Sequence, residues 1–240
     1  MSGESFSFKR FVVRQDRCAM KVGTDGVLLG AWAQGGRRIL DIGTGTGLVA
    51  LMMAQRFSDA HVCGVEIDAE AARQAQENAA SSEFAARVLI EAVSLQTYVG
   101  RMGQESVAPM FDSIVSNPPF FENSLTAPDQ TRTLARHAET LSYGELFGAV
   151  RLLLAPDGEF SASIPNDCLQ RFVSEGCLAG LFLKRKCAVK MVPRKQPKRY
   201  LLAFAKRMPK ELEAEEVTLM NADGSRSDWY ARLTSDFYLR

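Results

Sequence analysis

Histidine and closely spaced cysteines are scarce in this sequence, and their scarcity argues against a metal site. The chain has two histidines, His61 and His137, and five cysteines with no C-x-x-C pair: Cys18, Cys63, Cys168, Cys177 and Cys187. A zinc cluster needs such ligands at short spacings. We therefore expect no metal ion, and free thiols in a reducing cytoplasm.

Long apolar runs and an excess charge are also missing. No run approaches the roughly 20 residues of a membrane span, and the first residues lack the basic-then-apolar pattern of a signal peptide. The net charge of the 240 residues is +1. The total charge does not indicate a nucleic-acid partner, so any basic surface must be local. We expect a cytoplasmic globular protein without a membrane partner or an obligate protein partner.

A glycine-rich turn indicates the fold. Residues 38–42 form an apolar run that leads into the pattern D-x-G-x-G-x-G, made by Asp41, Gly43, Gly45 and Gly47, and a helical pattern follows. Strand, glycine turn and helix make the first unit of a dinucleotide-type α/β fold. The spacing is not G-x-G-x-x-G, and no Lys-Ser/Thr follows, which excludes a Walker phosphate loop. The glycines allow the backbone to approach a ligand.

An acidic residue follows at the spacing that such folds use for ribose. Residues 62–68 read as the second strand, and Glu66 near its end lies 19 residues after Gly47. A carboxylate at this position is placed to bind the two ribose hydroxyls of an adenosine moiety. Further strands are expected at residues 87–92 and 111–116, and a fifth at 159–164 after a turn made by Pro156, Asp157 and Gly158.

The stretch Asn117-Pro118-Pro119-Phe120 follows the fourth strand and is the candidate catalytic loop. Two prolines cannot continue a sheet ladder, so the chain leaves the sheet at Pro118 on a stiff loop. The side-chain carbonyl of Asn117 and the backbone carbonyl of Pro118 can accept hydrogen bonds from both N–H groups of a planar –NH2 substituent. Phe120 can stack on the ring that carries this substituent. Acceptors that favour a pyramidal nitrogen would free its lone pair for an electrophile. The alternative is a proline-stiffened turn with a packed phenylalanine.

The N-terminal region shows two local patterns. Apolar residues alternate through residues 6–13, which predicts a short strand or hairpin. A helix follows near residue 24, with Thr24 or Asp25 as its N-cap. The neighbouring glycines also allow close backbone approach to a ligand.

Basic residues gather near the end of the chain. Residues 181–192 and 199–206 read as the two strands of an antiparallel hairpin. Residues 184–199 hold eight cations and no acid, and an acidic run follows at 211–216. The cations at the hairpin tip are Arg194, Lys195, Lys198 and Arg199, and with Arg132 and Arg136 they are candidates for contacts to phosphates. The alternative is a solvated surface.

Together these motifs resemble a known family. The D-x-G-x-G-x-G loop, Glu66 and the Asn-Pro-Pro-Phe loop are similar to those of class I S-adenosylmethionine-dependent methyltransferases that act on an amino nitrogen. The stretch from Gln15 to Trp32 is similar to the N-terminal signature of bacterial valine-tRNA adenine-N(6)-methyltransferases, as are Phe237, Tyr238 and Leu239. The resemblance implies a Rossmann-like α/β fold with a seven-stranded, mostly parallel sheet and a C-terminal antiparallel hairpin. Residues 1–36 would form an extension that closes the cofactor pocket, and residues 37–240 the methyltransferase domain.

The resemblance also assigns roles. S-adenosylmethionine would be the cofactor, and the anticodon stem-loop of a valine tRNA the partner. The three glycines would line the methionine part, supported by Asp41, and Glu66 would bind the ribose. The pocket would be closed by Lys21, Thr24 and Asp25. The target adenine would lie against Asn117, Pro118 and Phe120. Where the family has an acid for the cofactor's adenine, this sequence has Ser94, whose hydroxyl can accept the same bond without a charge.

Other readings stay open. An rRNA adenine is one alternative target. A protein glutamine amide is another, although enzymes of that kind carry a helical N-terminal domain for which about 37 residues leave no room. A DNA adenine methyltransferase would need a separate base-reading domain. A non-catalytic RNA-binding α/β protein is the alternative outside the enzymes, and the intact Asn117–Phe120 stretch argues against it.

Overall fold

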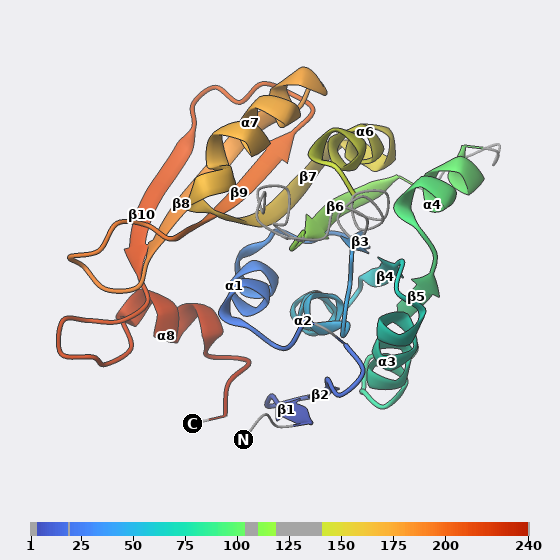
Figure 1. The fold of residues 1–240 in the computed structure, drawn as a ribbon, viewed down its shortest axis with the longest axis horizontal. Coiled ribbons are helices and arrows are strands. Elements are labelled where there is room, and N and C mark those ends of the chain that lie inside the picture. Colours follow the sequence, from blue (N-terminus) through green and yellow to red (C-terminus); the bar gives the residue numbers. More distant parts are fainter. Residues whose placement is uncertain (1–3, 19, 104–109, 119–140, 240) are drawn as a thin grey trace, which may run out of the picture.

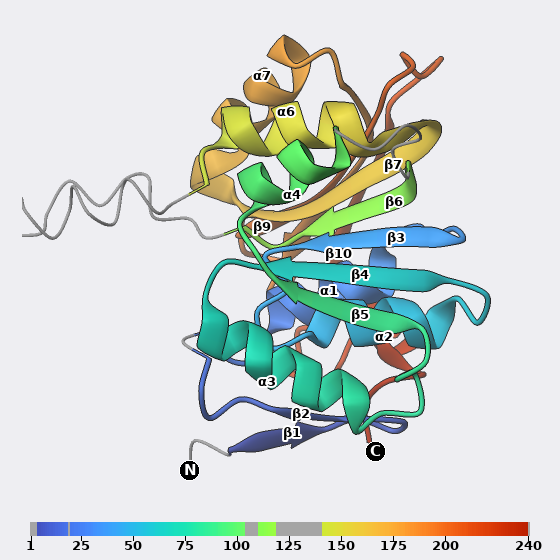
Figure 2. The same cartoon turned by 90° about the vertical axis from the view of Figure 1, so that its right-hand side faces the viewer.

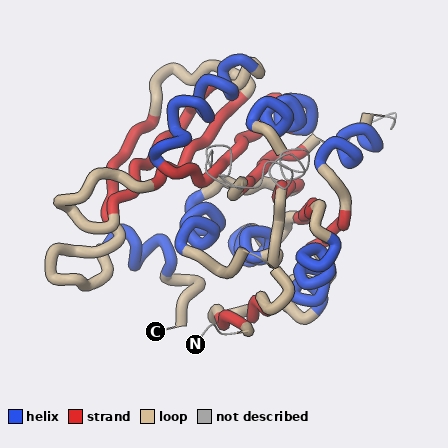
Figure 3. Tube along the Cα trace, viewed as in Figure 1, coloured by secondary structure: helices blue, strands red, loops and turns tan. Residues whose placement is uncertain are grey.

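The computed structural model describes residues 4–18, 20–103, 110–118 and 141–239. Eight of the described strands form one sheet, and two short N-terminal strands, β1 (Ser5–Ser7) and β2 (Val12–Arg14), pair separately as an antiparallel hairpin. The strands of the sheet lie in the middle of the molecule with helices on either side (Figure 3). This arrangement is the α/β architecture that the sequence predicts.

The order of the strands explains where a ligand can bind. Along the sheet the order is β10-β8-β9-β7-β6-β3-β4-β5. The strands are β3 (Arg38–Ile42), β4 (His61–Glu66), β5 (Val88–Ala92), β6 (Phe111–Ser116), β7 (Leu154–Pro165), β8 (Phe182–Lys190), β9 (Arg199–Ala205) and β10 (Glu213–Thr218). All pairs are parallel except those that β9 makes with β7 and β8. From β3 the chain continues to β4 and β5 on one side and later returns to β6 on the other side, so the direction of strand order reverses between β3 and β6. Ligands of such sheets bind at the carboxyl ends of the two strands that flank this point.

Helices cover both faces of the sheet (Figures 1 and 2). One face carries α1 (Thr24–Trp32), α2 (Leu48–Arg56), α3 (Ala69–Ala80) and α8 (Asp228–Thr234). The other carries α4 (Leu95–Met102), α6 (Tyr143–Leu153) and α7 (Leu169–Leu178), the last preceded by a 3-10 turn at Asn166–Cys168. On the second face Phe147, Phe160, Phe172 and Phe204 pack in stacked, tilted and edge-to-face contacts, with ring centroids 4.7 to 6.4 Å apart. None of the helices in the described ranges is long and apolar enough to cross a membrane.

The predicted hairpin at the N-terminus is confirmed, and it joins the two ends of the chain. Phe8 stacks on Phe11 and on Tyr238, with ring centroids 4.7 and 6.0 Å apart. The backbone N–H of Lys9 donates to the carbonyl of Phe237 at 2.8 Å. Phe8, Phe11 and Phe237 are buried in the same core cluster as α2. The N-terminal extension is therefore packed onto the rest of the molecule.

Three local expectations differ from the structure. The sheet gains an eighth strand, because the acidic segment β10 pairs in parallel with the basic strand β8. The expected turn at Pro156, Asp157 and Gly158 lies inside β7, where the register with β6 shifts between Phe111 and Ser113. Such an irregularity accommodates a proline, since part of the ladder is already interrupted. The N-cap of α1 is Gly23, in an extended conformation and without a side-chain cap, so the expectation of Thr24 or Asp25 as the cap was wrong.

Candidate active site

The glycine loop between β3 and α2 adopts a conformation that requires glycine. Gly43, Gly45 and Gly47 have φ values of 69°, 55° and 80°, in the left-handed region. Side chains other than glycine rarely adopt this region. Gly43 has nothing within 4 Å of the position that a Cβ would occupy. The loop thus presents bare backbone to the pocket.

Asp41 is hydrogen-bonded to this loop and to the start of α2. Its carboxylate is 1% exposed and accepts hydrogen bonds from the Thr44 hydroxyl at 2.6 Å and the Ala50 backbone N–H at 3.1 Å. Burial raises the pKa of Asp41 to about 7, and the two hydrogen bonds oppose that shift. The geometry agrees with the supporting role that the sequence suggested.

Glu66 is fixed at the end of β4 by two backbone groups. Its two carboxylate oxygens accept from the N–H groups of Gly45 at 2.9 Å and Asp68 at 3.0 Å. A carboxylate has about four acceptor positions, so two remain for hydroxyl groups of a ligand. The structure therefore joins the glycine loop and the predicted ribose-binding residue in one preformed unit.

A pocket opens above the loop at the carboxyl edge of the sheet. The predicted residues Lys21, Asp25, Asp41, Gly43, Gly45 and Asn117 line it, together with Met20, Gly23, Gly26, Thr44, Thr46, Leu48 and Val49. Thr24 begins α1 and Gly47 caps α2, and neither lines the pocket. Sequence reasoning missed Met20, Thr44 and Thr46, although the threonines alternate with the glycines and could have been found from the motif.

Asn117 brings an unsatisfied acceptor into this pocket. Its side-chain Oδ1 is buried and makes no hydrogen bond within the described part of the chain, and its Nδ2 lies 3.8 Å from the Met20 sulfur. A buried polar atom without a partner is rare, so this oxygen is available to a ligand donor. Pro118 is buried beside it. Phe120, Arg132 and Arg136 lie outside the described residues.

Ser94 has a different partner from the one expected. It is the N-cap of α4, where its hydroxyl accepts from the Thr97 backbone N–H at 3.1 Å and lies 2.9 Å from the Thr97 hydroxyl. Ser94 is not among the residues that line the pocket. Because the Ser94 hydroxyl caps α4, a contact with the adenine of a cofactor is not seen directly and stays a prediction.

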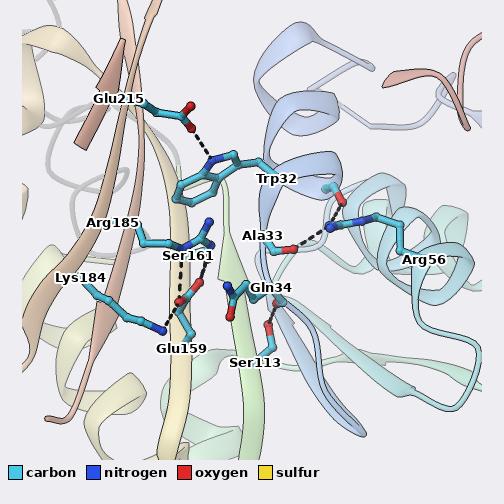
Figure 4. A network of polar contacts seen from close by, with 11 residues as sticks. Trp32, Ala33, Gln34, Arg56, Ser113, Glu159, Ser161, Lys184, Arg185 and Glu215 are labelled. Atoms are coloured by element: carbon cyan, nitrogen blue, oxygen red, sulfur yellow. Dashed lines mark hydrogen bonds and ion pairs between the residues drawn. The ribbon is translucent and has the colours of Figure 1, made fainter. Parts of the chain in front are cut away.

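The basic cluster divides into paired and exposed members. Glu159 is 4% exposed and binds both Lys184 at 3.1 Å and Arg185 at 2.5 Å, and the Arg185 guanidinium lies 3.8 Å from the Trp32 ring centroid (Figure 4). Lys190 pairs with Glu216 at 2.5 Å.

The hairpin tip itself keeps fewer free charges than the sequence suggested. Arg199, predicted as a phosphate contact, forms an ion pair with Asp25 of the pocket at 2.7 Å. Arg194, Lys195 and Lys198 are exposed on the loop between β8 and β9. Because β8 runs parallel to β7 and β6, this loop lies at the same edge of the sheet as Asn117.

No metal centre accompanies the pocket in the described ranges, where no group of three or more His, Cys, Asp or Glu could hold an ion.

Comparison with known proteins decides the family. Residues 22–150 match the model of the methyltransferase small domain. A tRNA1(Val) (adenine(37)-N6)-methyltransferase of Bacteroides fragilis is 44% identical over 242 residues, with all of both chains covered. Proteins of the same name from Trichodesmium erythraeum and Tolumonas auensis are 42% and 40% identical, over all of this chain and 100% and 99% of theirs.

This chain belongs to the tRNA1(Val) (adenine(37)-N6)-methyltransferase family.

The fold agrees with that family. A predicted O-methyltransferase of Agrobacterium tumefaciens superposes with a TM-score of 0.65 at 18% identity, covering 89% of this chain and 96% of its own. As a member of this methyltransferase family the protein is an enzyme, and its cofactor is S-adenosylmethionine. The pocket fits the cofactor, because it is lined by bare glycine backbone and by Asn117, whose buried Oδ1 has no partner among the described residues. The Glu66 carboxylate does not line the pocket itself, but it is hydrogen-bonded to Gly45 of the lining loop and keeps free acceptor positions.

Proposed function

We propose that this protein transfers a methyl group from S-adenosylmethionine to the exocyclic amine of adenine 37 in the anticodon loop of a valine tRNA. The observation that carries the proposal is the buried Oδ1 of Asn117, which has no hydrogen-bond partner among the described residues and belongs to a residue that lines the pocket with the glycine loop. The names of the relatives support the choice of nucleotide and tRNA.

The cofactor supplies an electrophilic methyl group on a positively charged sulfur. Asn117 Oδ1 and the backbone carbonyl of Pro118 would accept hydrogen bonds from the two N–H groups of the target amine, as the sequence suggests. Acceptors in this arrangement favour the pyramidal nitrogen of the transition state over the planar one of the ground state. Positioning of the amine in line with the methyl group would provide much of the rate enhancement.

We assign the remaining site residues as follows. Gly43 and Gly45, which line the pocket, bind the methionine part, and Gly47 shapes their loop at the start of α2. Glu66 binds the ribose. Lys21 and Asp25 close the pocket within the N-terminal extension of residues 1–36, and Thr24 supports them from the first turn of α1. Ser94 is proposed for the adenine ring of the cofactor. A base in an RNA loop must leave its stack to reach Asn117, at a cost of a few kcal/mol. Stacking on Phe120 would return about 1–3 kcal/mol.

The RNA would approach the same edge of the sheet. Arg194, Lys195 and Lys198 are proposed to bind phosphates of the anticodon stem-loop, with Arg132 and Arg136. The five cysteines are free thiols, which supports a reducing cytoplasm as the compartment.

The test is transfer of labelled methyl groups to a valine tRNA transcript, followed by nucleoside analysis. The expected product is N6-methyladenosine, and a transcript with guanine at position 37 should accept no label. Labelling of rRNA or of protein, with the tRNA left unlabelled, would refute the assignment. Asn117→Ala should abolish transfer while the cofactor Kd from isothermal titration stays within a few-fold. Turnover retained in that variant would remove Asn117 from the reaction.

A further inference from the structure

Two amide side chains are buried in α3 among small apolar residues. Gln74 is 1% exposed and Asn78 is 2% exposed. They are four residues apart and therefore share one face of the helix. The other buried residues of α3 are Ala71, Ala72, Ala75 and Ala79. Neither residue favours a buried helix interior unless its polar atoms are satisfied elsewhere. Their hydrogen bonds connect α3 to the N-terminal segment and to the glycine loop.

Asn78 joins the N-terminal segment to the glycine loop. Its Oδ1 accepts from the backbone N–H of Arg14, and its Nδ2 donates to the carbonyls of Arg14 and Thr46, all three at 2.9 Å. Both amide hydrogens of Asn78 are thus engaged. The side chain has no donor left for a ligand, but it connects two walls of the pocket.

Gln74 and Gln15 hold the next part of the same segment, which we call the strap and define as residues 14–18 and 20–22. The Gln74 side chain accepts from the backbone N–H of Arg17 at 3.2 Å and donates to Asp16 at 2.7 Å. The Gln15 side chain accepts from the backbone N–H of Val22 at 2.8 Å and is itself 7% exposed. The buried amides therefore fasten the strap at three backbone N–H groups.

The strap carries pocket residues. Met20 and Lys21 line the pocket together with the glycine loop, and the Met20 sulfur lies 3.8 Å from Asn117 Nδ2. The Cys18 sulfur is 3.8 Å from the position that a Cβ of Gly45 would occupy. The strap thus crosses the glycine loop, and its placement fixes one side of the cofactor pocket.

We propose that Asn78 and Gln74 are positioning residues for S-adenosylmethionine, holding the strap over the glycine loop without touching the cofactor. A binding-competent state that is populated only in part weakens the apparent affinity in proportion. Truncating Asn78 leaves the N–H and C=O of Arg14 and the C=O of Thr46 without their partner, which disfavours the fastened strap. The inference rests on the cofactor pocket and not on the identity of the RNA, so it survives a failure of the tRNA assignment.

The experiment compares Asn78→Ala and Gln74→Met with Glu83→Gln. The control removes an exposed ion pair, Arg10–Glu83 at 2.6 Å, which also ties the N-terminal hairpin to the α3 region but involves no buried amide. Isothermal titration with S-adenosylmethionine should show Kd raised about tenfold in Asn78→Ala, equivalent to the loss of one hydrogen bond near the upper end of the usual range. Gln74→Met should raise Kd several-fold, and Glu83→Gln should leave it within twofold.

Two further readouts separate positioning from general destabilisation. At saturating cofactor, kcat should stay within about threefold of wild type while KM for the cofactor rises with Kd. Hydrogen exchange of the peptide that contains Arg14 and Arg17 should speed up in the variants without cofactor and slow again when cofactor is added. Cofactor Kd within twofold of wild type in the folded variants would overturn the proposal, as would a fall in kcat with Kd unchanged. If Asn78→Ala does not fold, Gln74→Met alone decides.

Discussion

The tip of the β8–β9 hairpin should carry nearly all of the salt-dependent contribution that residues 184–199 make to RNA binding. Four of the eight cations in this range are committed to carboxylates: Lys184 and Arg185 to Glu159, Lys190 to Glu216, and Arg199 to Asp25. A fifth, Lys186, lies 5.2 Å from the Tyr200 ring centroid. Arg194, Lys195 and Lys198 are exposed at the tip. A variant with these three changed to glutamine removes the available charges and keeps the hydrophilic loop.

The magnitude follows from counterion release. Each cation that neutralises a phosphate contributes about 0.7 to 0.9 to the slope of log Kobs against log salt concentration. Removing the three exposed cations should therefore lower the slope by about 2 to 3. Between 50 and 200 mM salt, the affinity of wild type for the RNA should fall by about 20- to 40-fold more than the affinity of the triple variant does.

The assay is fluorescence anisotropy with a labelled anticodon stem-loop over that salt range, on the triple variant and on Lys190→Gln. Lys190→Gln removes a cation that the sheet already neutralises, so its slope should equal that of wild type. Cofactor affinity should be unchanged in both. A triple variant with the wild-type slope would show that the tip does not bind phosphates, and the basic run would then be a solvated surface.

Two other perturbations test the pocket. Arg199→Gln should weaken cofactor affinity several-fold in isothermal titration, because Asp25 loses its partner, and should leave the RNA salt slope unchanged; a slope lowered by about one would make Arg199 a phosphate contact after all. Asp41→Asn should change how stability depends on pH. Since the folded-state pKa of Asp41 is raised to about 7, its protonated form favours folding below about pH 4, and this contribution is lost as pH rises through 7. Urea unfolding at pH 5 and 8 should show the variant gaining a few kcal/mol relative to wild type at the higher pH; no such gain would refute the buried, protonated carboxyl.

The parts of the site that depend on short-range spacing were predictable. The glycine loop, Asp41 and Glu66 lie within 26 consecutive residues, and the structure joins them by direct hydrogen bonds. The start of α6 also follows a local rule, since Ser142 and Glu145 form a capping box at its N-terminus. Local rules suffice for such features because all partners are near in sequence.

The rest depends on partners that are distant in sequence. Lys198 and Arg199 are adjacent cations in the same predicted tip, yet Lys198 is exposed while Arg199, the first residue of β9, reaches Asp25. The strand β10 was not expected, because a run of glutamates has low β-propensity and gains its place only beside the cations of β8. Likewise, nothing in the composition of α3 says that Asn78 binds Arg14 and Thr46. Sequence gives the charge or polarity of a side chain, and only the fold gives its partner.

The pairing of acidic β10 with basic β8 has a consequence for how the enzyme would search for its substrate. A protein whose basic strand had no acidic partners would bind ribosomal and messenger RNA non-specifically, because all RNAs share the same phosphate backbone. Here three of the four cations of β8 pair with acids of neighbouring strands, Lys190 with Glu216 of β10 and both Lys184 and Arg185 with Glu159 of β7. The whole chain carries a net charge of only +1. Encounters with bulk RNA should therefore be brief, and selection would fall to the shape of the loop that can reach both the tip and the pocket.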